Sequence, residues 1–171
     1  MSLAEELLDQ AGILLRREPK HPKQTSLRRA VSTAYYALFN FLLDEAVKQF
    51  ASDTSLRLLV RRSFAHTEMK KAATALASGG RLPPHIAAVF PGPIPVELRS
   101  VAGAFVELQS ARRDADYNLL KTYARQQVSS WVEQVRTAFE DWRTVSNRTG
   151  DKAAVELFLT AMLLWDRWGK G

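Results

Sequence analysis

Hydrophobic side chains recur along most of this chain at spacings of three and four residues, which is the period of an amphipathic α-helix. No segment of useful length shows the strict alternation of apolar and polar positions that a half-buried β-strand requires. The pattern therefore predicts an all-α fold. The clearest helix covers residues 24–51, whose predicted buried stripe consists of Leu27, Val31, Ala34, Leu38, Phe41 and Leu42, with Tyr35 beside it.

Local signals predict where the helices begin and end. Ser2 and Glu5 form a capping-box pattern, which predicts a first helix that continues to about Arg17. Its expected buried face consists of Leu3, Leu7, Leu8, Ala11 and Leu14. Further helices are predicted over residues 24–51, 53–77, 96–114 or beyond, 119–146 and 151–168.

Two breaks interrupt this pattern. Thr67 could cap a new helical start within residues 53–77, and Gly79 and Gly80 are expected to end that region. Residues 81–95 hold five prolines and predict a long proline-rich loop.

These elements indicate an antiparallel helical bundle of about five or six helices in one domain, with residues 1–146 as the bundle. Residues 151–168 are expected to form an additional apolar helix, which packs on the bundle or serves as a dimer interface.

Neither end of the chain predicts membrane association. The N-terminal residues are acidic and amphipathic, unlike a signal peptide. The most apolar stretch, Ala153 to Trp165, is shorter than the roughly 20 residues that a membrane span needs. The chain has no cysteine, which excludes disulfides, thiol nucleophiles and thiolate metal sites. We therefore expect a cytoplasmic protein that does not bind membranes.

The net charge of +6 is concentrated in two segments. Residues 16–29 and residues 57–81 each carry a net +5, whereas the rest of the chain carries −4. If the two segments share a face, they would form a patch that binds phosphate groups; otherwise they are solvated, partly ion-paired helix surfaces. The candidate binding residues in these segments are Arg28, Arg29, Arg61, Arg62, Lys70 and Lys71.

The residues that metal or nucleophile chemistry requires are scattered. The three histidines, His21, His66 and His85, do not pair at helical spacing, and no H-E-x-x-H motif occurs. No G-x-S-x-G motif or glycine-rich phosphate loop is present. We therefore expect no metal and no cofactor.

One short segment concentrates polar chemistry. Residues 112–117 hold two arginines, two aspartates and a tyrosine, and in a helix Arg112 and Arg113 would both reach Asp116. The segment is either an ion-paired helix surface with a half-buried Tyr117, or an arginine–tyrosine cluster that grips a phosphate. Tyr35 and the next tyrosine along the chain are either core residues with one hydroxyl at the edge, or part of such a polar site.

Two blocks of sequence resemble the HEPN family of helical-bundle proteins. The block Arg28 to Phe39 is similar to the R-x-A-x-S-x-A-Y-Y-A-x-F helix of that family, and Arg112 to Tyr117 is similar to its R-x-x-A-D-Y block. The block Phe64 to Lys71 also resembles bacterial members. The resemblance covers residues 3–145.

This resemblance implies a protein that commonly dimerises. Many members are metal-independent ribonucleases, often toxins paired with a nucleotidyltransferase antitoxin, or parts of defence systems. Their arginine holds the phosphate, and a histidine four to six residues later exchanges a proton with RNA. Here Tyr117 stands in that range, and a tyrosine with an ordinary pKa of about 10 is a poor base at neutral pH.

The resemblance therefore implies a catalytically weak or silent domain that binds RNA, another nucleic acid or a nucleotide. One alternative is a ribonuclease that uses Arg112 and Tyr117, with His66 brought close by the fold. Another is a non-catalytic dimeric scaffold.

Overall fold

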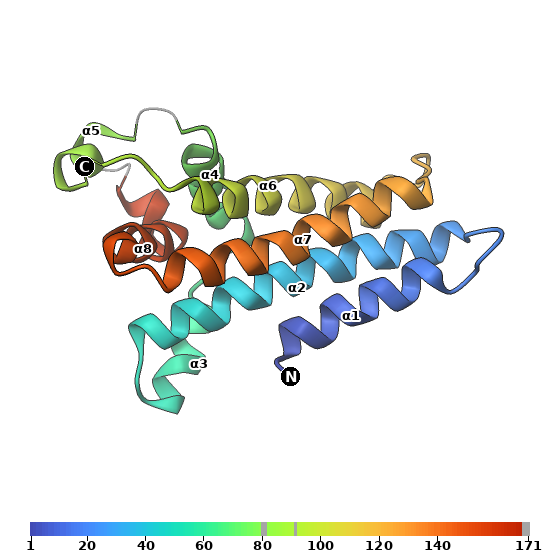
Figure 1. Cartoon of the computed structure of the whole chain (residues 1–171), viewed down its shortest axis with the longest axis horizontal. Coiled ribbons are helices and arrows are strands. Elements are labelled where there is room, and N and C mark those ends of the chain that lie inside the picture. Colours follow the sequence, from blue (N-terminus) through green and yellow to red (C-terminus); the bar gives the residue numbers. More distant parts are fainter. Residues whose placement is uncertain (80–81, 91, 169–171) are drawn as a thin grey trace. The chain divides into compact units, whose positions relative to one another are not determined.

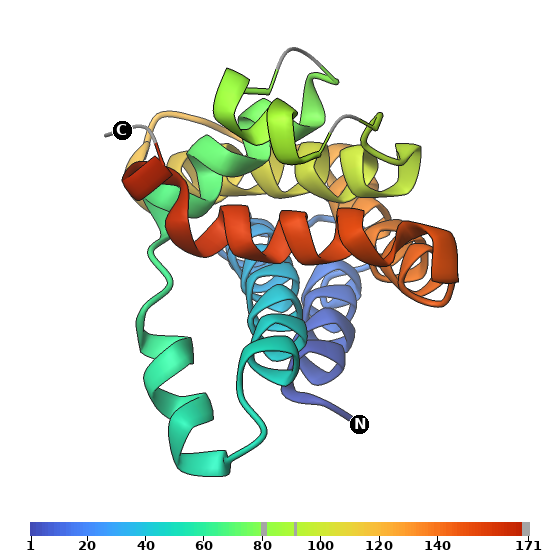
Figure 2. The same ribbon diagram turned by 90° about the vertical axis from the view of Figure 1, so that its left-hand side faces the viewer.

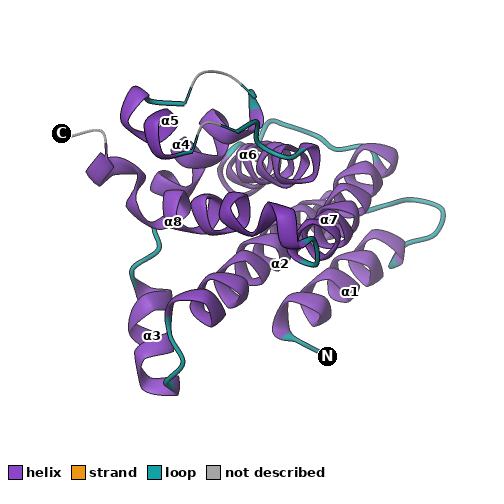
Figure 3. Cartoon of the chain, turned by 60° about the vertical axis from the view of Figure 1, so that its left-hand side comes forward, coloured by secondary structure: helices purple, strands orange, loops and turns teal. Residues whose placement is uncertain are grey.

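The computed structural model describes residues 1–79, 82–90 and 92–168. Within these ranges every regular element is helical and no strand occurs, which confirms the all-α prediction (Figure 3). Figure 1 shows the elements in chain order. The helices are α1 (Leu3–Arg16), α2 (Gln24–Phe50), α3 (Thr54–Arg62), α4 (His66–Ala77), α5 (Pro84–Val89), α6 (Val96–Tyr117), α7 (Arg125–Ser146), the short 3₁₀ helix η1 (Thr149–Asp151) and α8 (Lys152–Trp168).

The chain divides into two compact units, and the three longest helices contribute to both. Unit 1 consists of Met1–Phe41 and Ala104–Phe139. Unit 2 consists of Leu42–Gly103 and Glu140–Gly171.

The predicted capping box at the start of α1 is confirmed. The backbone N–H of Glu5 donates to Ser2 Oγ at 3.3 Å, and the backbone N–H of Ser2 donates to Glu5 Oε2 at 2.8 Å. Two N–H groups that would lack helical partners are thereby satisfied. The expected buried face of α1 is partly wrong, however. Its fully buried positions are Ala4, Leu8, Ala11, Gly12 and Leu15.

The leucines excluded from that face lie toward solvent. Leu3 is 53% exposed, and Leu7 and Leu14 are only half-buried. The face that packs inward is rich in alanine and glycine, whose small side chains let the neighbouring backbone approach closely. A prediction from hydrophobicity alone therefore placed part of the buried face on the wrong side of this helix.

The helical region predicted over residues 53–77 is divided into α3 and α4. α3 ends at Arg62, and α4 begins at His66 with Ala65 in the N-cap position. The expected cap, Thr67, therefore lies inside α4. Phe64 is buried in the connection between the two helices, and burial of its ring holds the chain at this break.

The predicted proline-rich loop contains a helix. Pro84 occupies the first turn of α5, where a missing N–H group is tolerated, and Ile86 is buried. Because of α5 and the break after α3, the described residues hold eight α-helices rather than five or six. Gly79 follows α4 with a φ of 59°, as expected of a helix-ending glycine. Gly80, Arg81 and Pro91 lie outside the described residues.

The connection between α6 and α7 is longer than the sequence predicts. α6 continues to Tyr117, and α7 begins at Arg125 rather than near residue 119. The Asn118 side chain accepts a hydrogen bond from the backbone N–H of Leu120 at 3.2 Å, which stabilises a turn in place of a helix start.

The apolar stripe predicted for α2 is confirmed as core, and α6 and α7 bury stripes of the same helical spacing. In unit 1 the rings of Phe41 and Phe139 stack with their centroids 4.1 Å apart. In unit 2 α8 lies against α4, as Figure 2 shows, and buries Phe158, Leu159 and Met162. The buried stripes consist of Leu27, Val31, Ala34, Leu38, Phe41 and Leu42 on α2, of Leu98, Val101, Ala102, Phe105 and Leu108 on α6, and of Val128, Trp131, Val135, Phe139 and Trp142 on α7.

Replacement of Phe158 by alanine should lower the free energy of unfolding by about 3–5 kcal/mol, because it leaves a cavity between Trp142 and the core of unit 2. Val89→Ala is the control, since Val89 is 80% exposed and its loss should change the free energy by no more than about 0.5 kcal/mol. Chemical denaturation followed by circular dichroism measures both. Equal effects of the two substitutions would contradict the assigned packing of α8.

Candidate functional site

The polar residues of the two HEPN-like blocks meet within unit 1, where α2 and α6 run antiparallel. Arg28 of α2 contacts Ala115 of α6, and Tyr36, two turns further along α2, contacts Arg112. Because residues four apart share one face of a helix, Arg28, Ser32 and Tyr36 form a single stripe on α2. This stripe faces the last turns of α6, and the residues along the contact constitute the candidate site.

The Arg112 guanidinium lies at the centre of the site. Its Nε forms an ion pair with Asp116 Oδ2 at 2.8 Å, and its Nη2 donates to the Tyr36 hydroxyl at 2.7 Å. Ser32 Oγ donates to the other oxygen of Asp116, so Asp116 is also held from α2. We call Ser32, Tyr36, Arg112 and Asp116 the Arg112 cluster. These bonds hold the guanidinium in one orientation.

Tyrosine side chains and one carboxylate determine the electrostatics of Arg112. The guanidinium carbon lies 5.4 Å from the centroid of the Tyr36 ring and 5.9 Å from that of Tyr35. Partial burial alone would lower the pKa of Arg112, but the interactions with Tyr36, Asp116 and Tyr117 outweigh it and raise the pKa. Arg112 is therefore a permanent cation. Its Nη1 makes no hydrogen bond or ion pair with any residue that the structure describes.

Tyr35 and Tyr36 differ in role: Tyr35 is a core residue, and Tyr36 presents its hydroxyl at the edge of the core. Tyr35 is fully buried, its ring centroid lies 5.7 Å from that of Phe105, and burial raises the pKa of its hydroxyl. Tyr36 lies at the edge, where its hydroxyl meets Arg112. The reading of this pair as core with one hydroxyl at the edge is confirmed, and Tyr35 supports the site from behind.

Arg28 is engaged with backbone rather than directed toward solvent. Its Nη1 donates to the carbonyl of Ala115 at 2.8 Å, and its Nη2 donates to those of Asn118 at 2.9 Å, Leu119 at 3.3 Å and Lys121. The carbonyls at the end of a helix have no intrahelical partner, so this arginine caps α6. Its neighbour Arg29 is exposed.

The connection after α6 is tied to α2 by a second set of bonds. The Gln24 side chain donates to the carbonyl of Tyr123 at 2.9 Å and accepts from its backbone N–H at 2.8 Å. Lys121 pairs with Asp114 at 2.5 Å. Together with Arg28, these contacts fix the path of residues 118–124 at one end of the Arg112 cluster.

An open hollow of about 630 Å³ lies at the end of α6, lined by residues next in sequence to Arg112 and Asp116 and by the start of the following connection. Tyr117, which is 73% exposed, and the exposed Arg113 both line it. The remaining lining residues are Asp114, Asn118, Leu119 and Leu120. Four predicted site residues, Arg112, Arg113, Asp116 and Tyr117, are thus gathered in the last two turns of α6.

Apart from Arg28, Arg29 and Tyr35, the other predicted residues belong to unit 2. Arg61 pairs with Asp44, and Lys71 pairs with Asp166 at 2.8 Å. The remaining members are Arg62, which is exposed, Lys70, which is half-buried, and His66, the first residue of α4. Two of these basic side chains, Arg61 and Lys71, are therefore neutralised by acids of the same unit.

Sequence reasoning missed Ser32 as a member of the site and left the role of Tyr36 open. The available signal was their spacing from Arg28, which places all three residues on one stripe of α2. That signal does not distinguish a polar contact from a solvated edge until the partner helix is known.

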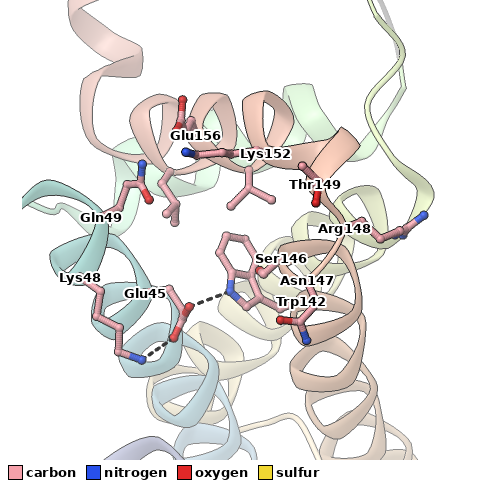
Figure 4. A pocket seen from close by; sticks show the side chains of 12 residues that line it. Glu45, Lys48, Gln49, Trp142, Ser146, Asn147, Arg148, Thr149, Lys152 and Glu156 are labelled. Carbon is pink, nitrogen blue, oxygen red and sulfur yellow. Dashed lines mark hydrogen bonds and ion pairs between the residues drawn. The ribbon is translucent and has the colours of Figure 1, made fainter.

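Unit 2 contains a separate pocket of about 410 Å³ that the sequence did not predict (Figure 4). The buried Trp142 donates from Nε1 to Glu45 Oε2 at 3.1 Å, and Lys48 pairs with the other oxygen of Glu45 at 2.7 Å. Figure 4 shows Gln49 from α2 and Lys152 from α8 among the residues that line the pocket, whereas the Arg148 side chain points away from it. Glu45 already has two partners, and the lining holds both basic and acidic side chains, so the pocket is not lined by charge of a single sign.

The described residues offer no arrangement for a metal. No group of three or more histidine, cysteine, aspartate or glutamate side chains among them could hold an ion. Within the same ranges, no helix combines the length and apolar character that a membrane crossing requires.

Replacement of Arg28 by alanine should lower the free energy of unfolding by about 2–3 kcal/mol, because it leaves carbonyls at the end of α6 without a charged donor. Arg29→Ala, which removes the exposed neighbouring arginine, should change that free energy by no more than about 0.5 kcal/mol. Urea denaturation of the two variants gives the comparison. If both variants match the wild type, Arg28 does not hold α6.

Comparison with known proteins leaves this geometry as the basis for a functional assignment. No family model, no curated protein and no solved structure matches the chain. The functional conclusion must therefore come from the chemistry that the Arg112 cluster can perform.

Proposed function

We propose that this protein is a HEPN-like domain that binds RNA through the Arg112 cluster and does not cleave it. The observation that carries the proposal is the state of the Arg112 guanidinium. Asp116 and Tyr36 hold it in place, while Nη1 makes no bond with a described residue. A planar guanidinium with N–H groups to spare can bind a phosphate oxygen, and an arginine whose orientation is already fixed loses less entropy on binding.

The surroundings of Arg112 fit a nucleotide better than a bare anion. Tyr117 exposes its ring, and Arg113 exposes its guanidinium beside the same hollow. Exposed aromatic rings bind unstacked bases, whereas arginines bind the phosphates that link them. The proposed ligand is therefore single-stranded RNA, with a free nucleotide as the smallest unit that would bind.

Binding is favoured over cleavage because the cluster lacks a proton carrier. The residues that interact with Arg112 are Tyr35, Tyr36, Asp116 and Tyr117, and none of them is a histidine. A ribonuclease of this kind needs a group that titrates near neutral pH to exchange a proton with the 2′-hydroxyl.

The rest of the proposal follows from the HEPN resemblance. It comprises an antiparallel bundle of the long helices, a homodimer, a cytoplasmic location, and a role in a toxin–antitoxin or defence system with a nucleotidyltransferase partner. The two sequence blocks support it, because their polar residues meet at one site within unit 1.

The Arg112→Ala variant tests the RNA site. Its dissociation constant for a fluorescein-labelled single-stranded RNA should rise by about tenfold, which corresponds to about 1.4 kcal/mol. Arg112→Lys should recover only part of the affinity, because lysine lacks the planar fork. Arg136→Ala is the matched control, since Arg136 is an ion-paired arginine on α7 of the same unit. Fluorescence anisotropy measures binding, and thermal melting verifies that each variant is folded.

Two results would contradict this site. One is equal affinity of Arg112→Ala and wild type for the RNA. The other is affinity that does not fall as salt is raised, because phosphate contacts release counterions and must depend on salt.

Incubation of wild-type protein with the same RNA in EDTA should leave the RNA at full length on a denaturing gel. The physical reason is the absence of a histidine among the partners of Arg112. Cleavage that Arg112→Ala abolishes would overturn the silent-domain proposal and establish the ribonuclease alternative, in which Tyr117→Phe should then also reduce the rate.

A further inference from the structure

Helix α3 lies with its apolar side toward solvent. None of its nine residues is buried, and its leucines Leu56, Leu58 and Leu59 are each more than half exposed. A folded protein normally turns an apolar helix face toward its core. An exposed face of this kind marks an interaction surface.

The reason for this orientation is visible in the contacts of α3 with α2. Arg57 Nε donates to the carbonyl of Ala51 at 2.9 Å, and Arg61 forms an ion pair with Asp44. At about 100° per residue, Leu59 lies on the side of α3 opposite these two arginines, and Leu56 lies about 100° from Arg57 and about 140° from Arg61. The polar side of α3 is therefore attached to its own chain, and the apolar side is left uncovered.

Helix α1 has an uncovered apolar side of its own. Leu3, Leu7 and Leu14 repeat at intervals of four and seven residues, which is the spacing of a helix–helix seam. Leu3 and Ile13 are more than half exposed, because α1 packs inward through its alanine-rich face. Both α1 and α3 thus lack a partner for part of their apolar surface.

The charges on α1 and α3 favour contact between α1 and α3 over contact of either helix with its own copy. α3 carries three arginines and no acid, whereas α1 carries Glu5, Glu6 and Asp9 against a single arginine. Pairing α1 with α1, or α3 with α3, would bring like charges together, and pairing α1 with α3 brings opposite charges together. Glu6 lies between Leu3 and Ile13 on α1, and Arg62 follows Leu59 by one turn. Both side chains are exposed, and neither forms an ion pair with a described residue.

We propose that α3 of one protomer packs against α1 of a second copy of this chain, with the leucines in contact and Arg62 beside Glu6 of the partner subunit. A two-fold axis would form the contact twice and close the assembly as a dimer. The inference rests on the homodimer of the proposed function. It does not depend on RNA binding, so the two can fail separately.

Charge reversal in two separate chains tests this interface. Sedimentation velocity at low salt over a dilution series should show a dimer for the wild type. Arg62→Glu alone and Glu6→Arg alone should each raise the dimer dissociation constant by at least about tenfold, because every α1–α3 contact then joins like charges. An equimolar mixture of the two variants should recover the dimer, since each mixed contact pairs opposite charges again.

Recovery in the mixture distinguishes contact between copies from contact within one chain, because mixing cannot repair a contact inside a single chain. Leu59→Asp should also dissociate the dimer, and Val89→Asp, at a still more exposed apolar site on α5, should not. The proposal is overturned by a monomeric wild type or by a mixture that stays monomeric. A monomer that binds anionic phospholipid vesicles through Leu59 would overturn it as well, and would assign α3 to a lipid surface instead.

Discussion

The backbone carbonyls at the end of α6 need hydrogen-bond donors, and the candidate site depends on the arginine that supplies them. Arg28 reaches from α2 to three residues of the following connection and to Ala115 of α6 itself. This contact sets the position of the last two turns of α6 against α2, because an arginine has several donors in a rigid plane. Arg112 and Asp116 lie in those turns, so their distances to Tyr36 and Ser32 follow from it.

The same arrangement explains why one arginine supports structure and another is available for function. Arg28 directs its terminal nitrogens toward backbone carbonyls, where a ligand cannot replace them without unfolding the helix end. Arg112 uses one edge of its guanidinium for Asp116 and Tyr36 and leaves Nη1 without a partner among the described residues. The buried Tyr35 behind it keeps the polar contacts on the outer side of the helix pair.

Apolar patterning predicted buried faces well where a helix is covered on several sides. The stripes of α2, α6 and α7 are buried as their periodicity indicates. It was partly wrong on α1, because an amphipathic pattern says that a face will be covered and does not say by which surface; the uncovered apolar side of α3 shows the same limit. On α1 the small residues pack inward. On α3 the arginines bind the Ala51 carbonyl and the Asp44 carboxylate, and the leucines face solvent. In both helices, exposed leucines are left that another surface could cover.

The sequence by itself determined the helical class, most helix ends and the two blocks that carry the polar chemistry, because local spacing and capping act between residues close along the chain. It also indicated that Arg112 and Asp116 share a helix face. Only the tertiary structure decided that Tyr36 and Ser32 complete the cluster, that Arg28 caps α6, and that Arg61 is neutralised by Asp44. Those contacts join residues far apart in the chain, and they depend on which helix faces meet.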